Sequence, residues 1–339
     1  MPQHREKSSF CLGLSIGCWR KRRALCGIRL LVMAVREDLL LEHIYRSAAE
    51  GDAGAAGGVL VGPGDDAAVV SVGGASALVT TDQLIAGRHF DADSTPVDQV
   101  GRKAIARCLS DIAAMGGAPV ACVVAAALPA AFEQGKALVD ALRSRALVWR
   151  CPLVGGDIAL SQGPLALTVT AMGAVSDSRG PVLRDGAKPG DGVYVTGAIG
   201  ASLATGWHLR FTPRLEEASV LIASLGSALT SMIDISDGLG KDAARIARAS
   251  GATLRLNASA IPLRDAARSD WRQSLCDGED YELLFTASAD PPGTVGISNT
   301  PVTRIGEVVV ADEKGPTCVV VAPDGEHIDA RAFGWEHAE

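Results

Sequence analysis

The sequence has few aromatic residues, and this shortage limits how its core can be built. Phenylalanine, tyrosine and tryptophan make up 4% of the 339 residues, whereas 47% are hydrophobic. We therefore expect a core of alanine, valine, leucine and isoleucine, and the length suggests about two domains. None of the eight cysteines forms a Cys-x-x-Cys pair, and no cysteine–histidine group has zinc spacing. Most cysteines lie in apolar runs, which indicates buried free thiols and a cytoplasmic protein.

Basic surface and the common nucleotide motifs are also lacking. The formal net charge is −7, which argues against a nucleic-acid partner. No P-loop sequence is present, and no Gly-x-Ser-x-Gly nucleophile motif. No stretch after the N-terminal region is typical of a membrane span, so we expect no membrane association. Phosphorylated ligands remain compatible with the acidic charge, because metal ions can supply the positive charge.

The N-terminal segment differs from the rest of the chain. A basic cluster at 20–23 precedes an apolar run that is too short to cross a bilayer and lacks a convincing signal-peptide cleavage site. We interpret residues 1–32 as an extension, either disordered or the product of an over-long start with Met33 as the true initiator. The predicted domains are 33–178 and 179–339.

The hydrophobic pattern predicts an α+β protein. Apolar spacing favours helices at 37–50, 98–117 and 132–150, and a buried strand at 119–129. Residues 151–175 are interpreted as a β-hairpin around a Gly-Gly-Asp turn. Strand–turn–helix units follow in the second half, so antiparallel hairpins and βα units are mixed within two domains.

Aspartates gather where the chain turns after a hydrophobic strand. Asp66, Asp82, Asp157 and Asp234 all occupy such places. Taken singly, each could cap a helix or form an Asx turn. As a set they suggest something else, because Asp111 lies inside a predicted helix, where it caps nothing.

Oxygen-rich acidic groups of this kind suit Mg²⁺. Asp65 and Asp66 are adjacent like charges, which is unfavourable without a cation. Mg²⁺ uses few carboxylates and completes its coordination with phosphate oxygens and water. The sequence therefore predicts magnesium–nucleotide chemistry on a scaffold without a P-loop.

Seven motifs in register carry a family resemblance. They are GDDAAVV, TTDQLIAGRHF, LSDIAAMGGAP, VGGD, LRDGAKPGD, IDISDGL and GEDYELLF, between about Glu37 and Trp335. Their order and spacing resemble the thiamine-monophosphate kinase family, a branch of the aminoimidazole ribonucleotide synthetase-like superfamily. The pair TTDQLIAGRHF and GEDYELLF favours this branch over its relatives.

The resemblance implies a fold, a reaction and a set of site residues. The fold would be two-domain and PurM-like, with an N-terminal mixed sheet that pairs into a barrel across a homodimer and a C-terminal α/β sandwich. The reaction would transfer the γ-phosphoryl group of ATP to thiamine monophosphate with several Mg²⁺ ions. By position, the implied metal ligands are Asp66, Thr81, Asp82, Asp111, Asp157, Asp234 and Asp237. ATP would contact Gly156, Asp157, Arg184 and Ser236, and thiamine monophosphate would contact His89, Glu279 and Trp335.

Simpler interpretations exist for several of these residues. His89 could be a strand-end surface residue, Trp335 an apolar lid, Arg184 an interdomain ion pair and Glu279 part of a turn. Two positions depart from the family pattern. Asp277 stands where the family usually has glycine, and Phe211 stands where it usually has proline.

No protein nucleophile is expected, because a phosphate oxygen of the substrate attacks in line and positioning supplies most of the catalysis. Two alternatives to the kinase remain. One is another ATP-using enzyme of the superfamily, similar to aminoimidazole ribonucleotide synthetase. The other is a nucleotide-binding regulator without turnover.

Overall fold

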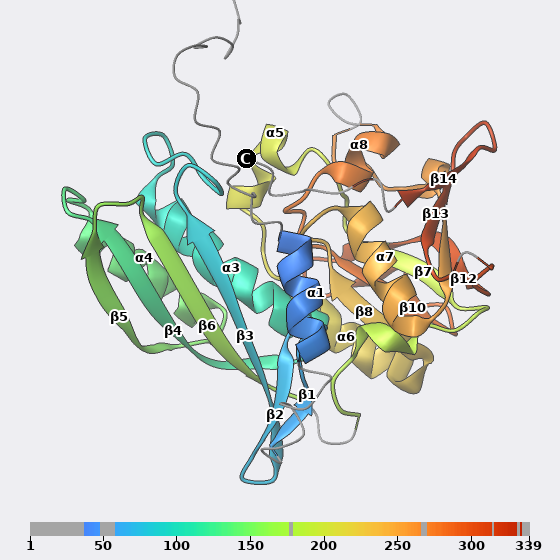
Figure 1. Ribbon diagram of the computed structural model, residues 1–339, viewed down its shortest axis with the longest axis horizontal. Helices are drawn as coiled ribbons and strands as arrows, with labels where there is room; N and C mark the ends of the chain where they lie inside the picture. Colours follow the sequence, from blue (N-terminus) through green and yellow to red (C-terminus); the bar gives the residue numbers. More distant parts are fainter. Residues whose placement is uncertain are drawn as a thin grey trace, which may run out of the picture. The chain divides into compact units, whose positions relative to one another are not determined.

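Two β-sheets with helices packed against them organise the chain (Figure 1). The computed structural model describes residues 37–47, 58–175, 179–265, 270–313, 315–330 and 333. The predicted extension at 1–32 and the predicted substrate residue Trp335 lie outside these ranges. The helix expected from residue 37 is α1 (Glu37–Ser47). Within the described ranges, every helix is too short or too polar to cross a membrane.

The first sheet has six strands in the order β1-β2-β3-β6-β4-β5. Their bounds are β1 Val59–Val61, β2 Ala68–Val72, β3 Ala75–Ile85, β4 Ala118–Pro129, β5 Leu153–Ser161 and β6 Ala166–Ala174. Only the β4–β5 pair is parallel, which makes the sheet mixed. Two helices pack against each other and against this sheet, α3 (Val97–Ala114) and α4 (Gly135–Val148), which confirms both helix predictions.

The hairpin predicted for 151–175 is wrong. Strand β4 lies between β5 and β6, and the Gly-Gly-Asp stretch lies inside β5 rather than in a turn. The second glycine, Gly156, is needed for close strand pairing instead. A Cβ on Gly156 would lie 1.9 Å from the carbonyl oxygen of Val124 on β4.

The second sheet follows the order β14-β13-β9-β12-β7-β10-β8, and β11 pairs with β12. Its strands are β7 Gly192–Thr196, β8 Leu229–Asp234, β9 Thr253–Asn257, β10 Leu283–Ala287, β11 Thr294–Val295, β12 Thr300–Val309, β13 Cys318–Val321 and β14 His327–Asp329. The helices of this half are α5 Ser202–Thr205, α6 Leu215–Leu225, α7 Leu239–Ser250 and α8 Trp271–Cys276. One core lies between the sheet and α7, and a second lies between the sheet and α6.

Helix α3 belongs to two cores at once. Its Ile105 and Leu109 are buried with the first sheet, whereas Ala113 and Ala114 pack with α6 and the second sheet. Each fully buried large aliphatic side chain contributes about 1.5–3 kcal/mol to this packing. Because both sheets contact α3, the polar side chains along it face loops from both halves of the chain.

Candidate active site

Three carboxylates from distant parts of the sequence converge beside α3. Asp66 follows β1, Asp111 lies on α3 and Asp234 ends β8. One oxygen of each lies within 4.8 Å of the others. Among the described residues, no other group of three acidic, histidine or cysteine side chains is placed to hold a metal ion. The convergence predicted from the sequence is therefore present for these three aspartates.

Strand alternation and helix spacing explain the arrangement. Thr80 on β3 faces α3 and donates its hydroxyl to Asp111 Oδ2 at 2.6 Å. Ser110, the preceding residue on α3, donates its hydroxyl to Asp234 Oδ2 at 2.6 Å. Both carboxylates are thus held in fixed orientations by neutral donors.

The three carboxylates of the cluster carry more negative charge than the neighbouring cations can balance. Arg184 pairs with Asp66 at 2.5 Å and is the arginine nearest to the cluster. Burial raises the pKa of Asp111 well above its usual value, and the nearby charge of Asp234 raises it further. Burial and Asp66 raise the pKa of Asp234 in the same way. A divalent cation would remove this repulsion, so the donor set fits Mg²⁺.

The other implied metal ligands have different surroundings. Asp82 lies on the same face of β3 as Thr80, and Arg107 of α3 pairs with it at 3.0 Å. Thr81 lies on the opposite face of β3, and its hydroxyl contacts Thr170 and the carbonyl of Val169. The hydroxyl beside the cluster is therefore that of Thr80, where the sequence interpretation placed Thr81.

The loop after β8 is organised by a residue that was not assigned to the site. Asp242 accepts the backbone N–H groups of Ser236 and Asp237, each at 3.0 Å. Burial raises the pKa of Asp242 to about 6, although Arg245 opposes the shift. Asp237 itself pairs with Arg245 at 2.5 Å and with Lys241 at 3.6 Å. The carboxylate of Asp237 thus lies beside the cluster's loop but belongs to an ion-pair network.

Two assigned residues lie on the edge strand of the first sheet. Gly156 and Asp157 are exposed on β5, and Asp157 does not belong to the carboxylate cluster. Arg184, in contrast, is buried at the site, and its guanidinium also donates to the carbonyl of Gly64 at 3.0 Å. The ion-pair interpretation of Arg184 is therefore correct for this structure, and its contact with ATP remains a prediction.

A second polar group lies about two turns from Asp111 along α3. The fully buried Lys103 donates to Glu279 at 2.7 Å, to the carbonyl of His89 at 2.6 Å, and contacts His208 at 2.9 Å. Burial disfavours the charge of Glu279, but the hydrogen bond with His208 and the charge of Lys103 outweigh it and lower its pKa to about 2. The two predicted substrate residues His89 and Glu279 are thus joined through one lysine.

Sequence reasoning missed Lys103. Arg107 follows it by one helical turn and Asp111 by two, so a basic pair on the helical face of Asp111 was the available signal. His89 also accepts the N–H of Ile85 on its Nδ1 at 2.9 Å, which fixes the ring at the end of β3.

The side chains at the two positions that depart from the family pattern both make specific contacts in the structure. Asp277 accepts the N–H of Ala201 at 2.7 Å, next to α5. Phe211 is buried and stacks on Tyr281, with ring centroids 4.0 Å apart. Both substitutions therefore brace the segment that carries Glu279.

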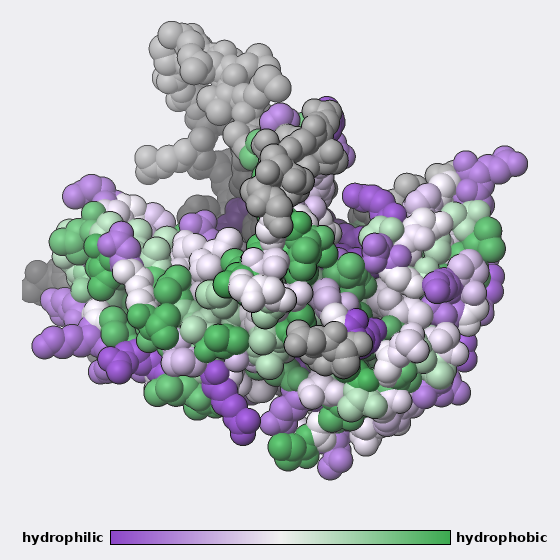
Figure 2. Space-filling view, turned by 90° about the horizontal axis from the view of Figure 1, so that it is seen from below, coloured by the Kyte–Doolittle hydropathy of each residue, from purple (hydrophilic) through white to green (hydrophobic). Residues whose placement is uncertain are grey.

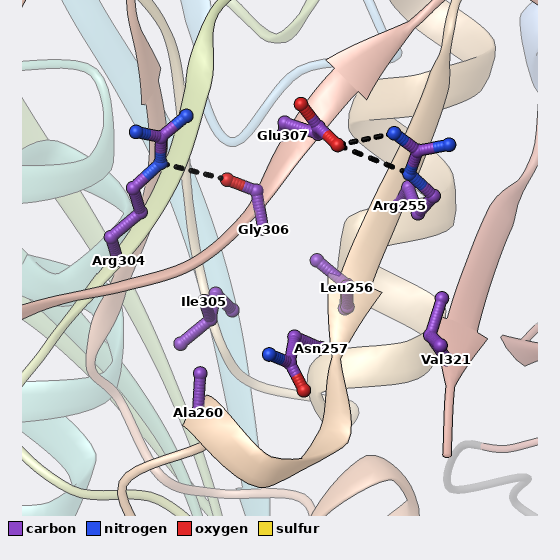
Figure 3. Close-up of a pocket in the computed structure, with 9 residues that line it drawn as sticks. All are labelled: Arg255, Leu256, Asn257, Ala260, Arg304, Ile305, Gly306, Glu307 and Val321. Carbon is purple, nitrogen blue, oxygen red and sulfur yellow. Dashed lines mark hydrogen bonds and ion pairs between the residues drawn. The ribbon is translucent and has the colours of Figure 1, made fainter. Parts of the chain in front are cut away.

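A separate hollow lies on the second sheet, far in sequence from the cluster. Its volume is about 470 Å³, and Arg255, Arg304 and Glu307 line it (Figure 3). Arg255 pairs with Glu307, and Arg304 Nε donates to the carbonyl of Gly306 at 3.3 Å. No member of the carboxylate cluster lines this hollow.

Known proteins match this chain over most of its length. Residues 64–175 match the AIR synthase related protein N-terminal domain, and residues 188–319 match the C-terminal domain. A thiamine-monophosphate kinase of Mycobacterium tuberculosis is 40% identical over 82% of this chain and 86% of its own length. One from Rhodopirellula baltica is 35% identical over 74% of this chain and 84% of its own length. The solved structure of AaThiL complexed with AMPPCP and TMP is similar with a TM-score of 0.74, at 26% identity, and covers 92% of this chain and 100% of that one.

Proposed function

Since the chain belongs to the thiamine-monophosphate kinase family, within the AIR synthase related proteins, we propose that it phosphorylates thiamine monophosphate with ATP to give thiamine diphosphate. The observation that carries this proposal is the convergence of Asp66, Asp111 and Asp234. Relatives named for this activity and a similar structure complexed with AMPPCP and TMP support the same pair of ligands.

The charge of the site accounts for its need of a cation. Both ligands are anionic, and the cluster that receives them is itself acidic. Mg²⁺ held by Asp66, Asp111 and Asp234 would neutralise the phosphates that have to approach each other. Thr80 and Ser110 orient two of these carboxylates, and Asp242 holds the loop of Ser236 and Asp237 in place. We propose that Asp82, Asp237 and Asp157 extend the metal site.

Positioning of the two phosphates supplies the rest of the catalysis. Arg184 offers a planar guanidinium suited to ATP phosphate, and Ser236 and Gly156 would approach the same ligand. Lys103 holds Glu279 and His89 on one side of α3, where thiamine monophosphate would bind. The attacking group is a phosphate oxygen of the substrate, so no protein nucleophile takes part.

A homodimer completes the proposal. The edge strand β5 exposes Val154, Ile158 and Leu160, and a groove of about 930 Å³ lies between it and α4. Hydrophobic patches are visible on the side of the molecule that carries the first sheet (Figure 2). A second copy that covers β5 would also cover Asp157. We further propose a cytoplasmic location, in agreement with five described free cysteines.

The test is an assay of purified protein with thiamine monophosphate, ATP and Mg²⁺. Formation of thiamine diphosphate, measured by chromatography, is the expected result. ATP hydrolysis without thiamine diphosphate would indicate another enzyme of the superfamily. Binding of ATP with no turnover would indicate a regulator. Omission of Mg²⁺ serves as the control and should abolish the product.

A further inference from the structure

Two buried hydrogen-bond donors at the site have no acceptor among the described residues. They are the hydroxyl of Tyr281 and the Nε–H of Arg107. Tyr281 is only 2% exposed, so bulk water does not satisfy its hydroxyl. Arg102 Nε is also buried without an acceptor, but its guanidinium lies over the ring of Trp149, with its central carbon 5.2 Å from the ring centroid. Buried polar atoms are nearly always paired, and exceptions at a binding site point to a ligand.

Both donors lie between the carboxylate cluster and the Lys103–Glu279 pair. The N–H of Tyr281 bonds to the carbonyl of Ile235 at 2.8 Å, and Ile235 directly follows Asp234. Arg107 lies on α3 between Lys103 and Asp111, one turn from each. The stack on Phe211 fixes the ring of Tyr281 in this position.

Electrostatic interactions place the two donors near each other. Burial alone would lower the pKa of Arg107, but electrostatic interactions with Tyr281, Asp82 and Glu279 outweigh burial and raise that pKa. Burial raises the pKa of Tyr281 well above its usual value, with Arg107 opposing. The hydroxyl therefore keeps its proton near neutral pH and is available as a donor.

The backbone of this segment is held in a conformation that ordinary residues rarely adopt. Glu279 has φ = 64° and Tyr281 has φ = 51°. The intervening Asp280 pairs with Arg264, and Glu282 pairs with Arg214 at 2.6 Å. These ion pairs orient the side chains of Asp280 and Glu282 toward the C-terminal half of the chain, whereas the side chain of Glu279 is directed toward α3. Backbone strain maintained in this way is typical of functional sites.

We propose that the Tyr281 hydroxyl, together with the Nε–H of Arg107, donates to phosphate oxygens of the acceptor substrate. This inference rests on the proposed kinase function and deepens it. Both groups can donate, and the guanidinium of Arg107 also carries a positive charge, so the pair matches an anionic phosphate better than a neutral alcohol. Tyr281 is thereby a substrate-binding residue that selects a phosphorylated acceptor.

The substitution Tyr281→Phe tests the proposal because it removes one oxygen and keeps the stack on Phe211. We expect KM for thiamine monophosphate to rise about tenfold, KM for ATP to stay within about twofold, and Tm not to fall. Tyr194→Phe is the matched control. Its hydroxyl is satisfied by Asp290 at 2.8 Å and its ring stacks on Phe285, so it should lower Tm and leave both KM values unchanged.

A binding measurement separates this inference from the proposed function. If the wild-type protein forms no thiamine diphosphate, the proposed function is wrong. Calorimetric titration with inorganic phosphate in the presence of Mg²⁺ then tests whether Tyr281 binds phosphate. Phosphate affinity at least threefold weaker in Tyr281→Phe supports the inference. Equal KM values in an active enzyme overturn it, as do equal or undetectable phosphate affinities in an inactive one.

Discussion

Two acid-rich regions meet along α3, and they differ in how their charge is balanced. Among the described residues, Arg184 is the one cation that forms an ion pair with the cluster of Asp66, Asp111 and Asp234, and Arg107 lies near Asp111 without pairing with it. The segment 279–282 also carries three carboxylates, but Lys103, Arg264 and Arg214 each pair with one of them. The comparison teaches that buried acid alone does not identify a metal site. A shortage of paired cations is the better indication, because an uncompensated buried carboxylate has either to keep a proton or to bind a cation.

The number of paired cations explains the pKa values of the carboxylates in the two regions only in part. Pairing with Lys103 and His208 lowers the pKa of Glu279 to about 2. Burial raises the pKa of Asp280 to about 7 in spite of Arg264. Complete burial can therefore raise the pKa of a carboxylate even when a cation is paired with it. The positions of carboxylates and cations indicate a metal site better than the pKa values do.

The largest expected effect comes from the unbalanced cluster. Asp111→Asn removes a proposed ligand and one negative charge, so turnover should fall at least about a hundredfold. The metal-free protein should melt at the same or a higher temperature, because repulsion within the cluster is reduced. Steady-state kinetics and thermal melts measure both effects.

Asp98→Asn, at the exposed start of the same helix, is the control for Asp111→Asn and should retain full activity. Near wild-type turnover of Asp111→Asn at saturating Mg²⁺ would show that the cluster is not the metal site. Asp237→Asn should also remove most turnover, and its ion pair with Arg245 makes it the weaker test.

The next effect tests the balanced region. Lys103→Met leaves Glu279 without its buried partner, so the free energy of unfolding should fall by about 3 kcal/mol. The double variant with Glu279→Gln should recover part of this loss, because no uncompensated charge remains. Urea denaturation measures both, and the exposed Lys136→Met is the control. If the double variant were no more stable than Lys103→Met, the charge-balance explanation would be incorrect.

Magnesium should stabilise the cluster measurably. At a concentration of 100 Kd, Mg²⁺ binding adds about 2.7 kcal/mol to the free energy of unfolding. Asp111→Asn should lose most of this gain, whereas Glu279→Gln should keep it. Equal gains in both variants would place the bound ion elsewhere.

The pH dependence of the metal-free protein should have a defined sign. Because burial raises the pKa values of Asp111 and Asp234, the folded state retains protons that the unfolded state releases. Their contribution to stability is thus most favourable below about pH 4 and decreases as pH rises toward the folded pKa values. Mg²⁺ displaces these protons, so its affinity should increase with pH. Calorimetry in two buffers of different ionisation enthalpy measures the protons released, and none would contradict the raised pKa values.

The smallest effect is expected at the exposed hollow of Figure 3. Arg255 and Glu307 are paired, but both side chains are more than 40% exposed. Arg255→Ala should therefore change the free energy of unfolding by no more than about 0.5 kcal/mol and leave turnover unchanged. A loss of activity would show that this surface takes part in the reaction.

The sequence predicted the parts of the site that local pattern determines. Apolar spacing identified α3, and the placement of Asp111 within it identified the cluster's central member. The resemblance implied Thr81 as a ligand, whereas the hydroxyl that bonds to Asp111 is that of Thr80, on the face of β3 that carries the buried Leu78 and Leu84. The partners of Lys103 could not be found in this way, since Glu279 is distant in sequence and contact depends on the packing of both sheets on α3.

Gly156 shows another limit of local pattern. Adjacent glycines usually mark a turn, and the sequence analysis interpreted them so. Here Gly156 allows two parallel strands to approach closely, and only the pairing of β5 with β4 makes this requirement visible.

Because α3 packs in two hydrophobic cores, movement of the two halves of the enzyme against each other is restricted. A hinge between the halves would have to pull Ala113 and Ala114 from one hydrophobic interior, or Ile105 and Leu109 from the other. Either event exposes apolar surface at considerable cost. If the proposed site is correct, opening and closing around substrates would fall to the loops at the ends of β3, β8 and α5, while α3 would stay fixed between the two cores.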